Sequence, residues 1–319
     1  MSRTVFVLVL VAACAPSGWT DITLRYTFDV KFAAFLPAEA QAQAKQAISA
    51  AIPHENHVRI KSEKAYSNAG PLGMIADYGR NEFTLIDPKT KRYATVGMSE
   101  FADKLAALQK PPAIPPEAQQ ILRNMHFDVQ SNKTGQIGLI QGIQSEENVI
   151  TLTMQVPGMP GAASAIRMEI HAWLAQANEI RRVPALQELA DYSARATKAM
   201  DPTQMIQKML SQFPGMGDQM TEPLQELWKL GGNLVVKQQL AVYIPAMAQA
   251  MQLQGTVVPG FDANAPLTEV HMELADISTA AIPDSTFALP ADYQQAPFEQ
   301  VAQALVQASP PLPPAAPKH

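Results

Sequence analysis

The sequence predicts an α+β fold in which helices cover one large antiparallel β-sheet. Long stretches alternate between apolar and polar residues, as half-buried strands do. They follow one another through short turns instead of alternating singly with helices, which argues against a parallel βαβ sheet. Helical patterns gather in insertions near residues 99–110 and 184–230. Because an antiparallel sheet with one apolar face needs a cover, we expect these helices to form a lid over the sheet.

The first half of the chain contains the longest predicted strand. Residues 21–32 alternate strictly, and one face carries Ile22, Leu24, Tyr26, Phe28, Val30 and Phe32. Shorter strands are predicted at 57–64 and 83–86. An Asp-Pro-Lys-Thr turn then leads into a strand at 92–96, which predicts a hairpin. The helix predicted at 99–110 ends where a proline-rich break begins.

A second group of strands follows this break. Strands are predicted at 127–130, 136–144, 149–156 and 166–174, with a turn at 132–135 between the first two. In the last two strands, apolar residues alternate with threonines, charged residues and His171. The pattern therefore predicts that the same sheet continues with one apolar face.

The remainder of the chain is helical at first and then returns to strands. The insertion at 184–230 has apolar residues spaced three and four apart, with prolines where its helices begin. Strands are predicted at 234–244 and 268–277, and a last helix within 292–307. Residues 309–319 form a proline-rich tail that we expect to be disordered. We therefore predict a single domain over 21–308.

The N-terminus predicts a lipid anchor. Cys14 is the only cysteine among 319 residues, and it follows a short apolar stretch and the run Val11-Ala12-Ala13. This pattern is typical of a bacterial lipoprotein signal peptide over residues 1–13, cut so that Cys14 bears the lipid. The apolar stretch is far shorter than the roughly 20 residues that span a bilayer. The alternative is an ordinary signal peptide in which Cys14 is discarded, although Pro16 would then directly follow the cut.

A lipidated Cys14 would place the domain close to a membrane of the cell envelope, facing the periplasm. Residues 14–20 form the tether, whose reach is at most about 25 Å at 3.3–3.6 Å per residue. Ala15 stands where aspartate would favour the inner membrane in enteric bacteria, so we expect the outer membrane. With this cysteine acylated, no disulfide is available, and core burial must hold the fold.

The net charge of the chain and the spread of its cationic residues argue against a strongly anionic partner. The chain has 24 Lys and Arg against 29 Asp and Glu, a net charge of −5. The cationic residues are not clustered in the sequence, so we expect no nucleic-acid partner, and nothing in the sequence suggests binding to anionic lipids.

One histidine cluster has the spacing of metal ligands. The run His54-Glu55-Asn56-His57 could bind Zn²⁺ if a third ligand came from elsewhere in the fold. It lies where a strand begins and lacks the His-Glu-x-x-His spacing of metalloproteases. A solvated turn is the interpretation that we favour, so we expect no metal and no other cofactor.

A second cluster could act in acid–base chemistry. His171, Glu169 and Trp173 share the polar face of a predicted strand, where a general base could stand beside an aromatic ring. We favour a surface row of a sheet, because no nucleophile is tied to the histidine. The sequence also lacks a nucleophile elbow, a phosphate loop and paired cysteines. We therefore predict that the protein is not an enzyme.

Three segments resemble a bacterial envelope family similar to the lipoprotein carriers LolA and LolB. They are the strand region 143–154, the run 173–175 that leads to 184–186, and the closing segment 282–293, which reads IPDSTFALPADY. The resemblance implies an open, strongly curved antiparallel half-barrel that helices close around an apolar cavity. It implies no particular ligand-contacting residue in this chain.

We expect the apolar face of the sheet to hold a hydrophobic ligand, a lipid or an acyl chain, without covalent chemistry. Flexible methionines on the insertion helices can repack around varied apolar shapes. The residues predicted to line the site are Tyr26, Phe28, Val30 and Phe32 from the first strand and Met205, Met209 and Phe213 from the lid. The alternative is a structural or protein-interaction module of the envelope with a filled core and no ligand.

Overall fold

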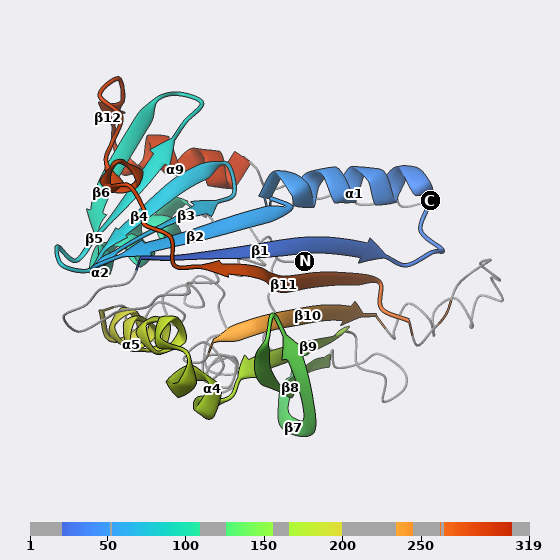
Figure 1. Cartoon of the computed structure of the whole chain (residues 1–319). Coiled ribbons are helices and arrows are strands. Elements are labelled where there is room, and N and C mark those ends of the chain that lie inside the picture. Colours follow the sequence, from blue (N-terminus) through green and yellow to red (C-terminus); the bar gives the residue numbers. More distant parts are fainter. Residues whose placement is uncertain are drawn as a thin grey trace, which may run out of the picture.

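A computed structural model describes residues 21–51, 53–108, 126–155, 166–199, 234–244, 262 and 265–307. It contains one sheet with helices packed around it (Figure 1). The strands are β1 (Ile22–Phe32), β2 (Glu55–Lys61), β3 (Lys64–Ala69), β4 (Leu72–Asp77), β5 (Glu82–Asp87), β6 (Arg92–Gly97), β7 (His126–Ile140), β8 (Ile143–Gln155), β9 (Ile166–Ala175), β10 (Val235–Tyr243), β11 (Thr268–Ser278) and β12 (Gln294–Gln295). The helices are α1 (Ala38–Ala51), α2 (Met98–Leu108), α4 (Ala177–Arg182), α5 (Pro184–Ala199) and α9 (Phe298–Gln307), with a short 3₁₀ turn, η1 (Asp284–Phe287).

The sheet has 12 strands in the order β12-β6-β5-β4-β3-β2-β1-β11-β10-β9-β8-β7. Every pair is antiparallel except β12 with β6. In the part of the chain that the structure describes, no ladder joins β7 back to β12. Figure 1 shows the sheet twisting strongly from β6 to β7 around the long central pair β1 and β11. The predicted α+β class with an open, curved sheet is confirmed.

Three helices fill the core against one face of the sheet. α2 and α9 pack together beside β5 and β6, and α5 closes the core with the buried side chains of Leu186 and Leu189. The ring of Phe101 lies 4.8 Å from that of Phe83 and 5.8 Å from that of Phe298, centre to centre. Full burial of each such apolar side chain stabilises the fold by about 1.5–3 kcal/mol. The helices predicted at 99–110 and from 184 onward therefore do cover the sheet over their described parts, and α9 joins them.

The turn predicted at 132–135 is wrong. β7 runs through these residues, and Thr134, Gly135 and the following Gln136 bulge opposite Glu147. The Thr134 hydroxyl donates to the Glu147 carboxylate (2.9 Å), which holds the bulge in place. The true turn is Gln141-Gly142, where both residues have positive φ (49° and 75°) as a two-residue hairpin turn requires.

The single strand predicted at 57–64 is also wrong, since the chain turns at Ser62 and Glu63 between β2 and β3. Ser62 has a φ of 55°, a left-handed conformation that a serine in the sequence does not predict. The strands β3 and β4 and the helices α1 and α4 were not predicted. α1 is rich in alanine and glutamine, and most of its described side chains are exposed. Its sequence therefore lacks the apolar stripe by which a helix is predicted.

Lys61 holds the beginning of β1 against the segment that precedes α9. Its ammonium donates to the Ile282 carbonyl (2.7 Å) and pairs with Asp284 (2.8 Å) and Asp21 (3.7 Å). The Asp21 carboxylate in turn accepts from the Ile282 amide. The hydrogen bond and charge of Lys61 hold the pKa of Asp284 below its ordinary value. Residues far apart in sequence thus hold the beginning of β1 in place.

Within the ranges described above, no helix combines the length and the apolar character needed to cross a membrane.

Candidate functional site

Two apolar rows cross five neighbouring strands of the sheet. Residues directly opposite one another in an antiparallel ladder project on the same face. The ladders of β1, β11, β10, β9 and β8 therefore place ten side chains together, nine of them apolar and one a threonine, which we call the apolar strip. Its rows are Val30, Val270, Leu240, Ile170 and Ile150, and then Phe32, Thr268, Val242, Met168 and Leu152.

The apolar strip continues the face that carries the core. One row nearer the core, Phe28 lies opposite Met272, which is buried, and Phe28 itself packs against the core. Within the strip, three side chains are buried, those of Leu240, Ile150 and Leu152, and the other seven are half-buried. A half-buried apolar surface has a hydrophobic free energy still to gain from a further apolar contact.

The residues predicted to line a ligand site separate into four groups. Tyr26 is 1% exposed and belongs to the core, where its hydroxyl donates to the Val235 carbonyl (3.4 Å) and burial raises the pKa of its phenol. Phe28 lies at the border of the core, whereas Val30 and Phe32 are part of the apolar strip. Met205, Met209 and Phe213 lie outside the described residues, as does the predicted lipid-bearing Cys14.

Most of the apolar strip comes from strands that the predicted lining residues did not include. Ile150 on β8, Ile170 on β9, Leu240 on β10 and Val270 on β11 each belong to an alternating segment. Alternation shows which face of a strand is apolar, and that signal was present. It does not show which strands are neighbours, so the rows become visible only in the sheet order.

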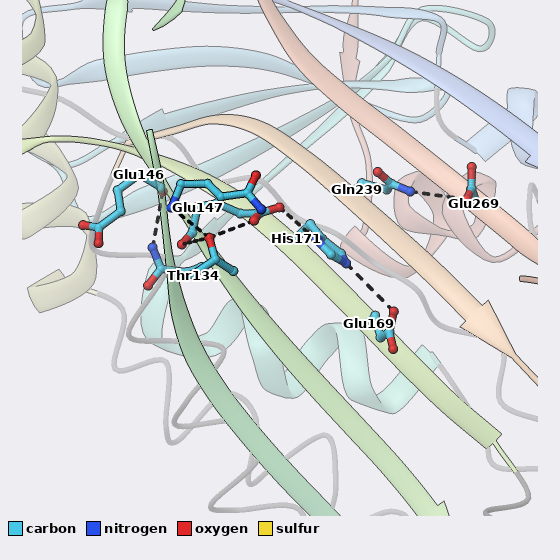
Figure 2. Close-up of polar contacts among 9 residues, drawn as sticks. Thr134, Glu146, Glu147, Glu169, His171, Gln239 and Glu269 are labelled. Carbon is cyan, nitrogen blue, oxygen red and sulfur yellow. Dashed lines mark hydrogen bonds and ion pairs between the residues drawn. The ribbon is translucent and has the colours of Figure 1, made fainter. Parts of the chain in front are cut away.

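The opposite face of the same strands is polar, and carboxylates and histidines pair across it (Figure 2). Nδ1 of His171 lies 2.9 Å from the Glu147 carboxylate, and its Nε2 lies 3.9 Å from that of Glu169. Two strands away, His271 lies 2.9 Å from Glu269, which also accepts a hydrogen bond from Gln239 (3.3 Å). These contacts join β8 to β9 and β10 to β11.

The polar face offers limited chemistry. Among the described residues, both groups that the His171 ring contacts are carboxylates, so the ring is not engaged with a hydroxyl or thiol that it could activate. Thr134 instead donates to Glu147 from the far side of that carboxylate. This geometry suits a network that ties strands together.

The cluster predicted near the start of β2 also holds local structure. Nδ1 of His54 donates to the Phe28 carbonyl (2.7 Å), and Glu55 pairs with Arg25 (3.3 Å) and His57 (3.7 Å). In the segments that the structure describes, no three His, Cys, Asp or Glu side chains are arranged to hold a metal ion.

Comparisons with known proteins leave the family open. No protein-family model matches the sequence, and no curated protein matches it. The structure of PNGF-II aligns with 91% of this chain at 10% identity and a TM-score of 0.31, and the chain spans 33% of that protein. The lipoprotein LppX of Mycobacterium tuberculosis aligns with 81% of this chain, and over 86% of its own, at 9% identity and a TM-score of 0.25. Neither value supports an argument about this chain, so the resemblance to the lipoprotein carriers stays a prediction.

Proposed function

We propose that this protein is a lipid-anchored protein of the cell envelope that holds a hydrophobic ligand, a lipid or an acyl chain, against the apolar strip. The observation that carries the proposal is the strip itself: two mostly apolar rows on the core-bearing face, with six of nine apolar side chains only half-buried. Binding is non-covalent and needs no catalytic group.

The dimensions of the strip suit a long apolar chain. It crosses five strands, so at a spacing of about 4.8 Å between neighbours it is roughly 19 Å wide. Each methylene moved from water onto such a surface contributes about 0.8 kcal/mol. Five or six well-covered methylenes thus correspond to about 4–5 kcal/mol before the cost of immobilising the chain is subtracted. An apolar ligand of acyl-chain length is therefore favoured over a small polar metabolite.

A titration with a fluorescent fatty acid tests this function. We expect saturable binding by the full-length chain, and displacement of the probe by an unlabelled fatty acid of the same length. A rise in emission that neither saturates nor yields to the competitor would count against a defined site.

A protein-interaction module is the second candidate, because α2, α5 and α9 already fill the core over much of the sheet. In that function the apolar strip serves only to complete the fold. Cross-linking in intact cells distinguishes the two, since a stoichiometric protein partner, together with no fatty-acid binding, supports the interaction module.

A further inference from the structure

The end of the β7–β8 hairpin is an uncharged and partly apolar surface. We define the hairpin end as residues 134–145, which read TGQIGLIQGIQS and contain no ionisable side chain. Since 17% of the chain is charged, a segment of this length would carry about two charges at the average composition. The lack of charge coincides with two exposed apolar side chains.

Leu139 is 75% exposed and Ile137 is 49% exposed, and in the described ranges these are the exposed large hydrophobic residues. Both lie on β7, the edge strand, and project on one face because they are two residues apart. Beside them is a hollow of about 360 Å³ that Gln144, Glu179 and Arg182 also line. Exposed apolar side chains that gather at one edge of a sheet leave apolar surface that a partner or a membrane can cover.

Of the charged groups beside the hollow, the cationic ones are exposed to solvent and the anionic one is buried. Arg182 donates to the Glu179 carboxylate (2.6 Å), and this contact holds the pKa of Glu179 below its ordinary value. The Glu179 side chain is 10% exposed, whereas that of Arg182 is 63% exposed, and Arg181 next to it is exposed as well. The neighbourhood of the exposed leucine therefore complements an anionic surface.

The hairpin end shares one end of the sheet with the first described residues of the chain. Ser145 lies opposite Ala175, whose amide donates to the Leu234 carbonyl (2.9 Å) at the beginning of β10. Tyr26, near the beginning of β1, donates to Val235, the next residue along β10. The tether predicted over residues 14–20 would thus leave the fold at the same end.

We propose that the hairpin end is a second membrane contact, in which Ile137 and Leu139 enter the lipid surface and Arg181 and Arg182 face anionic phosphates. The inference rests on the proposed lipid anchor, because that anchor brings this end of the sheet within about 25 Å of the bilayer.

An environment-sensitive label tests this contact. In the full-length protein acylated on Cys14, whose sulfur then carries the lipid, Gln141→Cys supplies a unique free thiol at the hairpin turn while Ile137 and Leu139 stay in place. The matched control is Lys89→Cys in the exposed turn between β5 and β6, near the opposite edge of the sheet. Both proteins carry an NBD label and are reconstituted into vesicles of phosphatidylethanolamine and phosphatidylglycerol.

We expect the emission of the label at Gln141→Cys to rise and shift to the blue, while the label at Lys89→Cys stays unchanged. Adding Leu139→Gln should weaken vesicle partition sensed at the hairpin by about tenfold, the effect of losing one apolar side chain from the lipid. If the two labels behave alike, the hairpin does not enter the membrane, and this inference is overturned even if a protein cross-links there.

The fatty-acid titration on the same proteins keeps this outcome separate from the proposed function. Leu139→Gln should leave fatty-acid affinity unchanged, because the bulge at Thr134 separates the hairpin end from the apolar strip. If the emission of the hairpin label does not change while fatty-acid binding is intact, the membrane contact alone is overturned. Absence of fatty-acid binding in the chain without hairpin substitutions overturns the proposed ligand instead.

Discussion

Leu240 on β10 lies directly opposite Val270 on β11, and Leu240 is buried whereas Val270 is half-buried. The pair occupies the middle of the apolar strip, with Val30 on one side and Ile170 on the other. Because the strip joins side chains from distant parts of the chain, its function can be tested one strand at a time.

Val30→Gln should weaken fatty-acid binding about tenfold, since a polar amide replaces a half-buried apolar side chain of the strip. The matched control is Lys31→Gln, one residue along the same strand and exposed on the other face. We expect Lys31→Gln to bind as the unsubstituted protein does. Equal losses for both variants would show that the apolar face is not the binding surface.

Leu274→Ala should lower the free energy of unfolding by about 2–5 kcal/mol, because Leu274 is fully buried and its truncation leaves a cavity. Leu139→Ala removes the same atoms from an exposed site and should stay within about 0.5 kcal/mol. Urea denaturation of both variants gives the comparison. Similar costs would contradict the position of the core.

The sequence predicted the strands through their alternation, and the strength of that signal followed burial. β1 alternates over its whole length because one face meets the core and the other meets solvent. The prediction of a turn at 132–135 failed because Asn132 and Gly135 are turn-forming residue types. In the structure, the side chain of Glu147, which is 13 positions from Thr134, stabilises a bulge there instead. Local patterns do not contain that contact.

The site was predictable only in part for the same reason. Val30 and Phe32 were identified from β1, but their neighbours on β11 are more than 230 residues away in sequence. Pairing over that separation depends on the complete sheet order. The exposure of Leu139 was also hidden, since its alternation with Ile137 resembles that of a half-buried strand.

Glu147→Ala should lower the free energy of unfolding by about 1–3 kcal/mol, because it leaves Thr134 and His171 without the acceptor that they share. The neighbouring Glu146→Ala removes only a surface pair with Lys133 (3.8 Å) and should change stability by no more than about 1 kcal/mol. Thermal unfolding at neutral pH measures both. A smaller effect at Glu147 than at Glu146 would show that the network does not tie the strands.

Asp284→Asn should make the stability of the protein less sensitive to acid. The pKa of Asp284 is lowered in the folded protein, so its pairing with Lys61 stabilises the fold fully above the ordinary aspartate pKa of about 3.9 and is lost as pH falls through the folded value. The difference in urea midpoint between the two proteins should therefore shrink from pH 7 towards pH 2. It should also shrink in 1 M salt, which screens exposed charges. A difference that grows in acid would contradict this assignment.

Native mass spectrometry of the protein purified from membranes tests the central claim most directly. We predict a chain that begins at an acylated Cys14 and carries a further lipid, which is released on activation without breaking a covalent bond. Val30→Gln should reduce the share of the lipid-bound species, and Lys31→Gln should not. A protein with no bound lipid, in which the Val30 variant is indistinguishable from the unsubstituted chain, would contradict it.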